Sequence, residues 1–237
     1  MKNKLFQSTL KKYLISGLQI TCLMIFFLMT RATNAQVTLN LNLFIQGFYT
    51  GGGMMDNNGA GGFLYITGQS VNPADVDFVS IAAIDPNTFN PADEQQGILQ
   101  TNGNVVVTFG PSVIEGFPYY IRVIHRSCVE TWSAVPVTMN ALTTYLFSTS
   151  PSMAYGDNQT PTSAQGIPDG IGFAFYNGDF NQDGSIDASD YLELDPDVQN
   201  GIGGYAGNDF NGDGAVDGLD IPLFICNIES GVAAFRP

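Results

Sequence analysis

The chain has 237 residues, of which 22 are acidic and 8 are basic, so its formal net charge is −14 at neutral pH. This excess of acid excludes proteins that bind nucleic acid or anionic membranes through basic patches, because such binding depends on contacts between Lys or Arg and phosphate. It favours a cationic partner, for which calcium is the obvious candidate, and the length suffices for one large or two small domains with buried cores.

Residues 1–35 have the pattern of an export signal. A lysine-rich start precedes a mostly apolar stretch over 13–29, and the sequence TNAQ fits cleavage after residue 35. An uncleaved membrane anchor is the alternative, but the apolar run is short for a bilayer span and contains polar residues. Cleavage leaves three arginines, no lysine and a charge of −19. We expect a secreted or cell-surface protein without membrane insertion after cleavage, in which Cys128 and Cys226 either form a disulfide or remain separate buried thiols.

Residues 36–176 are predicted to form an antiparallel β-sandwich. From Val37 to Ile45, apolar and polar residues alternate, which is the period of a strand with one buried face. Further strands are expected at 62–67, 77–84, 104–109, 119–126, 135–139, 143–148 and 171–176, and a loop at 155–170. Many short strands with little helical periodicity are typical of such a sandwich.

The stretch at 119–137 contains Arg122, His125, Arg126 and Trp132, including the only histidine and the only tryptophan of the chain. One interpretation is a recognition patch with an aromatic platform. The favoured one is that the arginines pair with carboxylates on neighbouring strands while Trp132 fills the core. His125 and Cys128 are not expected to act as a nucleophile pair, because residues three apart on a strand point to opposite faces.

An acidic segment, DFNQDGSIDASD at 179–190, recurs as DFNGDGAVDGLD at 209–220. Calcium takes about 6 to 8 oxygen ligands, and a twelve-residue loop supplies them from positions 1, 3, 5, 7, 9 and 12. The predicted ligands are Asp179, Asn181, Asp183, Ser185, Asp187 and Asp190 in the first loop, and Asp209, Asn211, Asp213, Ala215, Asp217 and Asp220 in the second. Position 7 uses its backbone carbonyl, so serine and alanine serve equally. The repeat therefore predicts two calcium ions.

The remaining loop positions have structural roles in this prediction. The glycine at position 6 of each loop permits a sharp turn. Ile186 and Val216 are expected to pair the two loops back to back and to bury a small core, while Asp190 and Asp220 lie in the first turn of a following helix. Because the crowded carboxylates repel one another without a cation, we expect folding of this segment to be coupled to calcium binding.

Two loops that each end in Asp resemble the dockerin module, best known from bacterial polysaccharide-degrading assemblies, over residues 178 to about 230. The resemblance implies docking onto a cohesin-type receptor through loop positions 10 and 11, here Ala188 and Ser189, then Gly218 and Leu219. These two pairs differ from each other, and the basic residues that usually follow on dockerin helices are absent. Pro196 is expected to interrupt the first helix.

The stretches at 41–55 and 119–137, followed by the acidic double loop, resemble a module of secreted and cell-surface proteins of Gram-negative bacteria. In that module an extended β-domain runs directly into dockerin-like repeats, which implies an architecture and a location rather than an activity. The sequence has no HExxH, GxSxG or CxxC pattern and no phosphate-binding glycine loop. We therefore expect a non-catalytic protein.

The whole prediction is a mainly β chain with a small α C-terminal domain: a signal peptide at 1–35, a β-sandwich at 36–176 and a dockerin-like calcium domain at 177–237. Its expected function is protein docking or surface assembly. One alternative is an accessory protein of polysaccharide breakdown whose sandwich binds carbohydrate or weakly hydrolyses glycosides. Another is a purely structural protein stiffened by calcium. An exposed groove of aromatic rings would favour the carbohydrate alternative, with these candidates: Tyr49, Tyr65, Tyr119, Tyr120 and Trp132.

Overall fold

Strand β1 (Val37–Asn42) is the central strand of a three-stranded sheet in this computed structural model. The structure describes residues 36–56, 63–165 and 172–237. β1 pairs antiparallel with β7 (Asn104–Phe109) and parallel with β11 (Leu142–Leu146). Every second residue of β1 is buried, as its alternating sequence predicts.

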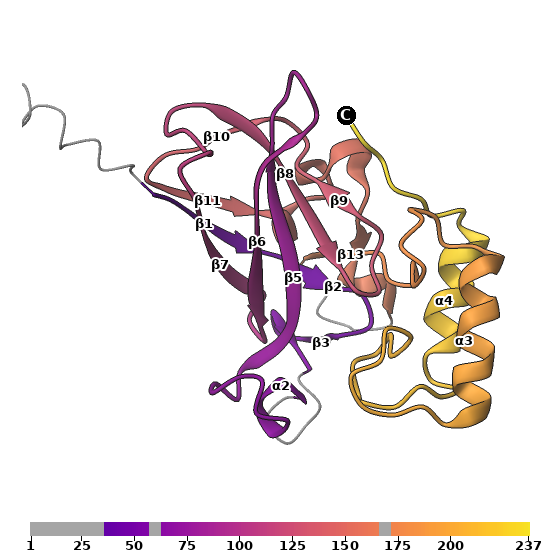
Figure 1. Ribbon diagram of the computed structural model, residues 1–237. Coiled ribbons are helices and arrows are strands. Elements are labelled where there is room, and N and C mark those ends of the chain that lie inside the picture. Colours follow the sequence, from indigo (N-terminus) through magenta and orange to yellow (C-terminus); the bar gives the residue numbers. More distant parts are fainter. Residues whose placement is uncertain (1–35, 57–62, 166–171) are drawn as a thin grey trace, which may run out of the picture. The chain divides into compact units, whose positions relative to one another are not determined.

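The second large sheet has the strand order β10-β8-β5-β6, with β9 also paired to β8. Its strands are β5 (Asp75–Ile84), β6 (Pro91–Gln100), β8 (Pro118–His125), β9 (Thr131–Trp132) and β10 (Val137–Thr138). All of these pairs are antiparallel. The two sheets form layers (Figure 1), and the inward side chains of both belong to one hydrophobic core.

Smaller elements complete the β-region. They are the sheet β12 (Thr160–Pro161), β13 (Phe173–Phe175) and β2 (Phe44–Ile45), the hairpin β3 (Tyr49–Gly51) and β4 (Met54–Met55), and the short 3-10 helices Phe147–Thr149, Pro151–Met153, Tyr155–Asp157 and Thr162–Gln165.

The predicted mainly β fold is confirmed. The sandwich is not purely antiparallel, however, because the β1–β11 and β13–β2 pairs are parallel. Parallel neighbours need long connections, and the chain between the members of each pair is long enough.

The strand predicted at 62–67 is wrong, because this stretch forms the short helix α2 (Phe63–Ile66). The backbone and hydroxyl of Thr67 both donate to the Phe63 carbonyl, at 3.1 and 2.7 Å. Leu64 is the buried residue of the helix, whereas Tyr65 and Ile66 are exposed. Local hydrogen bonds therefore outweigh the strand tendency of a short apolar run that has no partner strand.

Strand β6 was not predicted. It lies at the edge of its sheet, and only Gly97 and Leu99 of its ten residues are buried. A strand that buries so few side chains has little apolar alternation to detect. Gly97 is needed for close packing, since a Cβ atom there would lie 2.4 Å from a methyl group of Val105.

Helices α3 (Ala188–Asn200) and α4 (Ile221–Glu229) lie side by side (Figure 1) and enclose a second hydrophobic core. The rings of Tyr191 and Phe224 stack between them with centroids 6.0 Å apart. The prediction that Pro196 interrupts the first helix is wrong, because α3 continues through it. Pro196 removes one hydrogen bond to the Leu192 carbonyl. Both residues are exposed, so water can satisfy that carbonyl.

By their contacts, residues 36–237 form one compact unit. The division at residues 176 and 177 stays a prediction. The proposed signal peptide at 1–35 lies outside the described residues. Among the residues that are described, no helix is both long and apolar enough to cross a membrane.

A buried amide cluster joins the β-region to the C-terminal segment. The side chains of Gln46 and Asn227 bond reciprocally, at 3.2 and 2.6 Å. Asn177 donates its backbone N–H to Gln46 Oε1 at 3.1 Å and its side-chain amide to the carbonyls of Gln46 and Phe210. Gln46, Asn177 and Asn227 are all at most 5% exposed. Asn177 Oδ1 is the one amide atom of this cluster without a hydrogen-bond partner. Amides paired at this depth favour one arrangement of the two regions, because any other leaves further buried polar groups unpaired.

We predict that Gln46→Ala lowers the free energy of unfolding by about 2–3 kcal/mol, because it leaves buried donors of Asn177 and Asn227 without their acceptor. Gln96→Ala, at an exposed position of β6, is the matched control and should change stability by less than about 0.5 kcal/mol. Urea denaturation of both variants measures the difference. Equal effects of the two substitutions would contradict a structural role for the amide cluster.

Candidate metal centre

The first acidic loop is shaped by its own side chains, which accept hydrogen bonds from backbone N–H groups further along the loop. Asp179 Oδ2 accepts from the Gly184 N–H at 3.2 Å and Asn181 Oδ1 from the Asp183 N–H at 2.8 Å. Asp183 Oδ1 accepts from the Ser185 N–H at 3.0 Å. Positions 1, 3 and 5 are thereby held on the inside of one turn.

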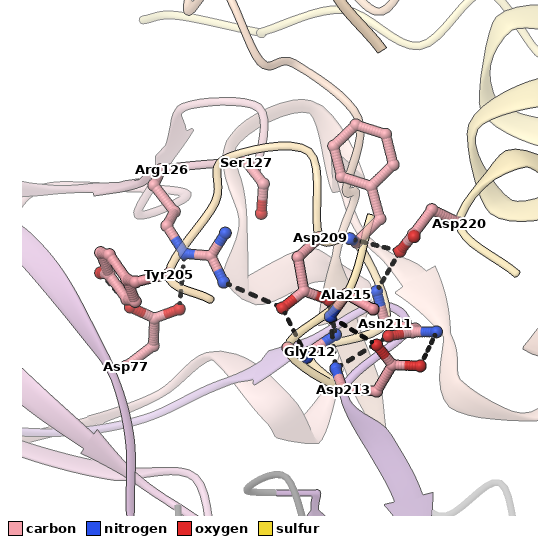
Figure 2. A network of polar contacts seen from close by, with 12 residues as sticks. Asp77, Arg126, Ser127, Tyr205, Asp209, Asn211, Gly212, Asp213, Ala215 and Asp220 are labelled. Carbon is pink, nitrogen blue, oxygen red and sulfur yellow. Dashed lines mark hydrogen bonds and ion pairs between the residues drawn. The ribbon is translucent and has the colours of Figure 1, made fainter. Parts of the chain in front are cut away.

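The second loop repeats this arrangement residue by residue (Figure 2). Asp209 Oδ2 accepts from the Gly214 N–H at 3.0 Å and Asn211 Oδ1 from the Asp213 N–H at 2.8 Å. Asp213 Oδ1 accepts from the Ala215 N–H at 2.9 Å. The sequence repeat therefore corresponds to a repeat of local geometry.

Position 12 closes each loop from its far end. Asp190 Oδ1 accepts from the N–H groups of Phe180 and Asn181, at 2.9 and 3.1 Å, and its Oδ2 from that of Asp187 at 3.0 Å. Asp220 makes the equivalent three bonds in the second loop. Both carboxylates are fully buried. Asp190 lies in the first turn of α3, whereas Asp220 precedes α4 as its N-cap residue.

Left-handed backbone occurs at two positions in each loop. Gly184 and Gly214 at position 6 have φ of 92° and 85°, as their predicted turn requires. Position 4 is also left-handed, with φ of 58° at Gln182 and 77° at Gly212. Sequence reasoning missed this position because only the second loop has glycine there. Gln182 is held by its side-chain amide, which donates to the Cys128 carbonyl at 3.2 Å.

The prediction that Ile186 and Val216 pair the two loops back to back is wrong. The Ile186 N–H donates to the Val232 carbonyl at 2.9 Å, and the Val216 N–H donates to the Ile202 carbonyl at 2.7 Å. Each loop thus pairs with a different segment, which satisfies its backbone without the other loop. Both side chains are nevertheless buried in the same small core, as predicted.

The donor atoms of both loops suit a hard cation, because they are carboxylate, amide and carbonyl oxygens. Asp179 Oδ1 is buried without a hydrogen-bond partner, an arrangement that a cation would relieve. Burial, with the charges of Asp190 and Asp183, raises the pKa of Asp179 to about 7. Burial also raises the pKa of Asp209 to about 6, although Arg126 acts in the opposite direction. Within the described ranges, no group of three or more His, Cys, Asp and Glu side chains is by itself placed to hold a metal ion.

The arginines of the β-region pair with carboxylates of β5 and β6, which confirms the first part of the favoured interpretation of the stretch at 119–137. Arg122 lies 3.0 Å from Glu94, and Arg126 lies 2.9 Å from Asp77. Trp132 is 6% exposed and packs in a small cluster of its own. This stretch is therefore largely internal.

The prediction that His125 and Cys128 point to opposite faces is wrong. Strand β8 ends at His125, and the following turn brings Cys128 Sγ to 3.3 Å from His125 Nδ1. On its other side, His125 Nε2 lies 3.0 Å from Asp77 Oδ2. His125 and Cys128 are at most 2% exposed, and burial raises the pKa of the thiol well above its usual range. A buried, protonated thiol has neither the charge nor the access of a nucleophile.

The sequence leaves open whether Cys128 and Cys226 form a disulfide, and in the structure they are separate free thiols. Cys128 is buried beside His125, whereas Cys226 is exposed on α4. The expectation of two buried thiols therefore holds for Cys128 alone.

We predict that the stability of the chain, measured relative to that of His125→Gln, falls as the pH drops below about 6.5. The comparison cancels the opposite contribution of Asp179 and Asp209, whose raised pKa values favour the folded state as the pH falls. Burial lowers the pKa of His125 from its ordinary value of 6.5. The unfolded chain therefore takes up the proton first, at up to about 1.4 kcal/mol per pH unit. Asp77, whose pKa lies well below its usual range because His125 and Arg126 outweigh the effect of burial, contributes only at lower pH.

Denaturation at several pH values between 7 and 4.5 measures this slope. The chain has one histidine, so the variant removes the whole histidine contribution. Identical slopes in the two proteins would contradict the buried neutral state of His125.

The comparisons with known proteins bear on the segment that carries the loops. Residues 177–229 match the family model of the dockerin type I domain. The predicted resemblance to the dockerin module is confirmed. The dockerin-like segment, defined as residues 177–229, contains both loops and both C-terminal helices. A comparison with curated proteins gives no match.

Two crystal structures of type II cohesin-X-dockerin complexes from Acetivibrio cellulolyticus, a C-terminal and an N-terminal interface mutant, are similar to this chain at 15% and 14% identity. The matches cover 83% and 81% of this chain and 97% and 95% of the other chains. Their TM-scores are 0.46 and 0.44. The likeness is weak, and no functional conclusion rests on it.

Proposed function

We propose that this chain is an exported, non-catalytic protein whose dockerin-like segment binds two calcium ions and docks onto a cohesin-type receptor. The observation that carries the proposal is the repeated loop geometry inside a segment matched by the dockerin type I family. Two copies of one cation-binding arrangement, each followed by a helix, need two ions to balance their carboxylates.

The calcium ligands would be the residues at positions 1, 3, 5, 9 and 12 of each loop, with a backbone carbonyl at position 7. Bound calcium would neutralise carboxylates that repel one another in a compact loop. The chain itself orients these side chains. Asp187 and Asp217 each accept the N–H two residues ahead, at 2.7 and 2.8 Å. Asp187 thereby also caps α3.

We predict that calorimetric titration finds two calcium ions per chain and that Asp179→Ala and Asp209→Ala each remove one. At a calcium concentration a hundred times the dissociation constant, one site stabilises the fold by about 2.7 kcal/mol, so the melting temperature should rise over that in chelator. Asp195→Ala is the matched control, since Asp195 lies in α3 outside the loops. No binding at millimolar calcium would refute the calcium proposal.

Exposed apolar side chains stand in the second loop and on both helices of the dockerin-like segment. Leu219, at position 11 of the second loop, is 66% exposed, and Leu192 on α3 is 74% exposed. Ile225 and Cys226 are exposed on α4. Apolar side chains held on rigid helices beside a calcium loop suit a protein partner better than a small polar ligand.

We predict that Leu219→Ser weakens binding to a cohesin-type receptor by about tenfold or more, because it removes an apolar contact at the proposed interface. Calcium binding should be unchanged, since the Leu219 side chain is exposed and position 11 supplies no ligand of the proposed site. Val71→Ser, at a 95% exposed position of the β-region, is the control. Surface plasmon resonance against immobilised cohesin domains of types I and II measures the effect, and equal binding by both variants would contradict this interface.

Burial of three of the five aromatic candidates supports docking over carbohydrate binding, whereas Tyr120 is half-buried and stacks on Phe89. Tyr49, Tyr119 and Trp132 are 2%, 4% and 6% exposed, so their ring faces are unavailable to a sugar. Tyr65 is exposed at 44%, but it stands on α2 rather than in a groove with the other candidates. The buried state of Cys128 likewise supports a non-catalytic role.

A further inference from the structure

The two loops are alike internally but differ in what packs against them. Gly212 of the second loop touches the β-region so closely that a Cβ atom there would lie 3.0 Å from the Phe48 ring. A Cβ atom at Gly47 would lie 2.2 Å from the Phe210 carbonyl, which also belongs to the second loop. The residues at position 5 show the same difference in packing. Asp183 of the first loop is exposed, whereas Asp213 of the second loop is partly buried.

Arg126, at the end of β8, reaches the second loop (Figure 2). Its guanidinium lies 2.9 Å from Asp77 Oδ2 and 4.0 Å from Asp209 Oδ2. It also lies over the ring of Tyr205, 4.6 Å from the centroid. Asp77, which is 1% exposed, holds the arginine in place and accepts a hydrogen bond from the Tyr205 hydroxyl. The cation is therefore fixed beside position 1 of the second loop.

The equivalent carboxylate of the first loop has different surroundings. Asp209 Oδ1 accepts from the N–H groups of Gly212 and Asp213, at 2.8 and 3.1 Å, and Asp209 Oδ2 faces the arginine. Asp179 Oδ1 has no hydrogen-bond partner. In the described part of the chain, Asp179 makes no ion pair with an arginine. One position-1 carboxylate is thus satisfied by the chain, and the other is not.

A different arginine, Arg236, lies near the first loop, beside Gly184. Its side chain is 59% exposed and pairs with Glu130 at 2.7 Å. Solvent and Glu130 therefore screen its charge from the loop. Arg126 is better shielded, with a side chain 16% exposed, so its field acts on Asp209 with less screening.

We propose that Arg126 makes the two loops unequal, by acting as a built-in cation that lowers the calcium affinity of the second loop below that of the first. The inference rests on the proposed calcium function. A metal ion held by Asp209 would share that carboxylate with the guanidinium, and the two positive charges would repel each other. Without calcium, the same ion pair helps to keep the second loop packed on the β-region. Arg126 is thus a residue that tunes the second site rather than a ligand of it.

The test is calorimetric titration of calcium into the full chain in two backgrounds. Asp179→Asn removes a ligand of the first loop, so that calcium binding by the second loop is measured alone. Asp209→Asn does the reverse. We expect Arg126→Gln to raise the calcium affinity of the second loop on the order of tenfold, since it removes a charge near the ion. The first loop should change by less than about twofold, and Arg126→Lys should stay near the unmodified protein. In chelator, the free energy of unfolding of Arg126→Gln should be lower than that of the unmodified protein. The substitution thus lowers stability without calcium while it raises calcium affinity.

Arg122→Gln is the matched control, because it removes an arginine from the same strand that pairs with Glu94 rather than with a loop. An unchanged or weaker second site in Arg126→Gln, or an equal gain in Arg122→Gln, would overturn the inference. Should Arg126→Gln unfold in chelator, competition titration from the calcium-loaded protein gives the same affinity. Failure of both loops to bind calcium in the unmodified chain would refute the proposed function itself, whereas two occupied loops with no effect of Arg126→Gln would refute only this inference.

Discussion

The C-terminal segment of this protein depends on the cost of burying carboxylates. Asp179, Asp190, Asp209 and Asp220 are at most 3% exposed, and each must find donors or a counter-charge. Backbone N–H groups of the loops supply many of these donors, which is why the loops close into turns and why helices begin where they do. Arg126 supplies a counter-charge to one carboxylate from outside the segment. Packing, capping and ion pairing in this region all follow from that requirement.

Contacts of the turn after β8 help to hold the β-region and the dockerin-like segment together as one unit. The Ser127 carbonyl accepts from the backbone N–H groups of Gly178 and Asp179, at 2.7 and 3.1 Å. Gln182 donates to the Cys128 carbonyl, and Arg126 reaches Asp209. The turn after β8 therefore contacts position 1 of both loops. The stretch at 119–137, for which a recognition patch was the less favoured interpretation of the sequence, anchors the acidic segment.

Patterns with a strict local cause could be predicted from the sequence. The alternation in β1 reflects one buried face, and the two loops reflect the spacing that oxygen ligands require. What could not be predicted depends on contacts between distant residues. Strand β6 is defined by its pairing with β5 rather than by its composition. The partners of Ile186 and Val216 lie in segments with no signal of their own, and the contact of Arg126 with Asp209 spans residues far apart in the chain.

The position of the turn after β8 also determines how a tethered molecule would carry mechanical load. Besides the covalent link through β13 and the amide cluster, tension applied to the C-terminal segment would reach the β-region at the end of β8, through the bonds to Ser127 and Cys128. β8 pairs antiparallel with β5 over six residue pairs, from Val79 with His125 to Ile84 with Tyr120. A pull along β8 loads these hydrogen bonds together in shear instead of opening them one at a time. The connection thus transmits force into the middle of a sheet rather than to its edge.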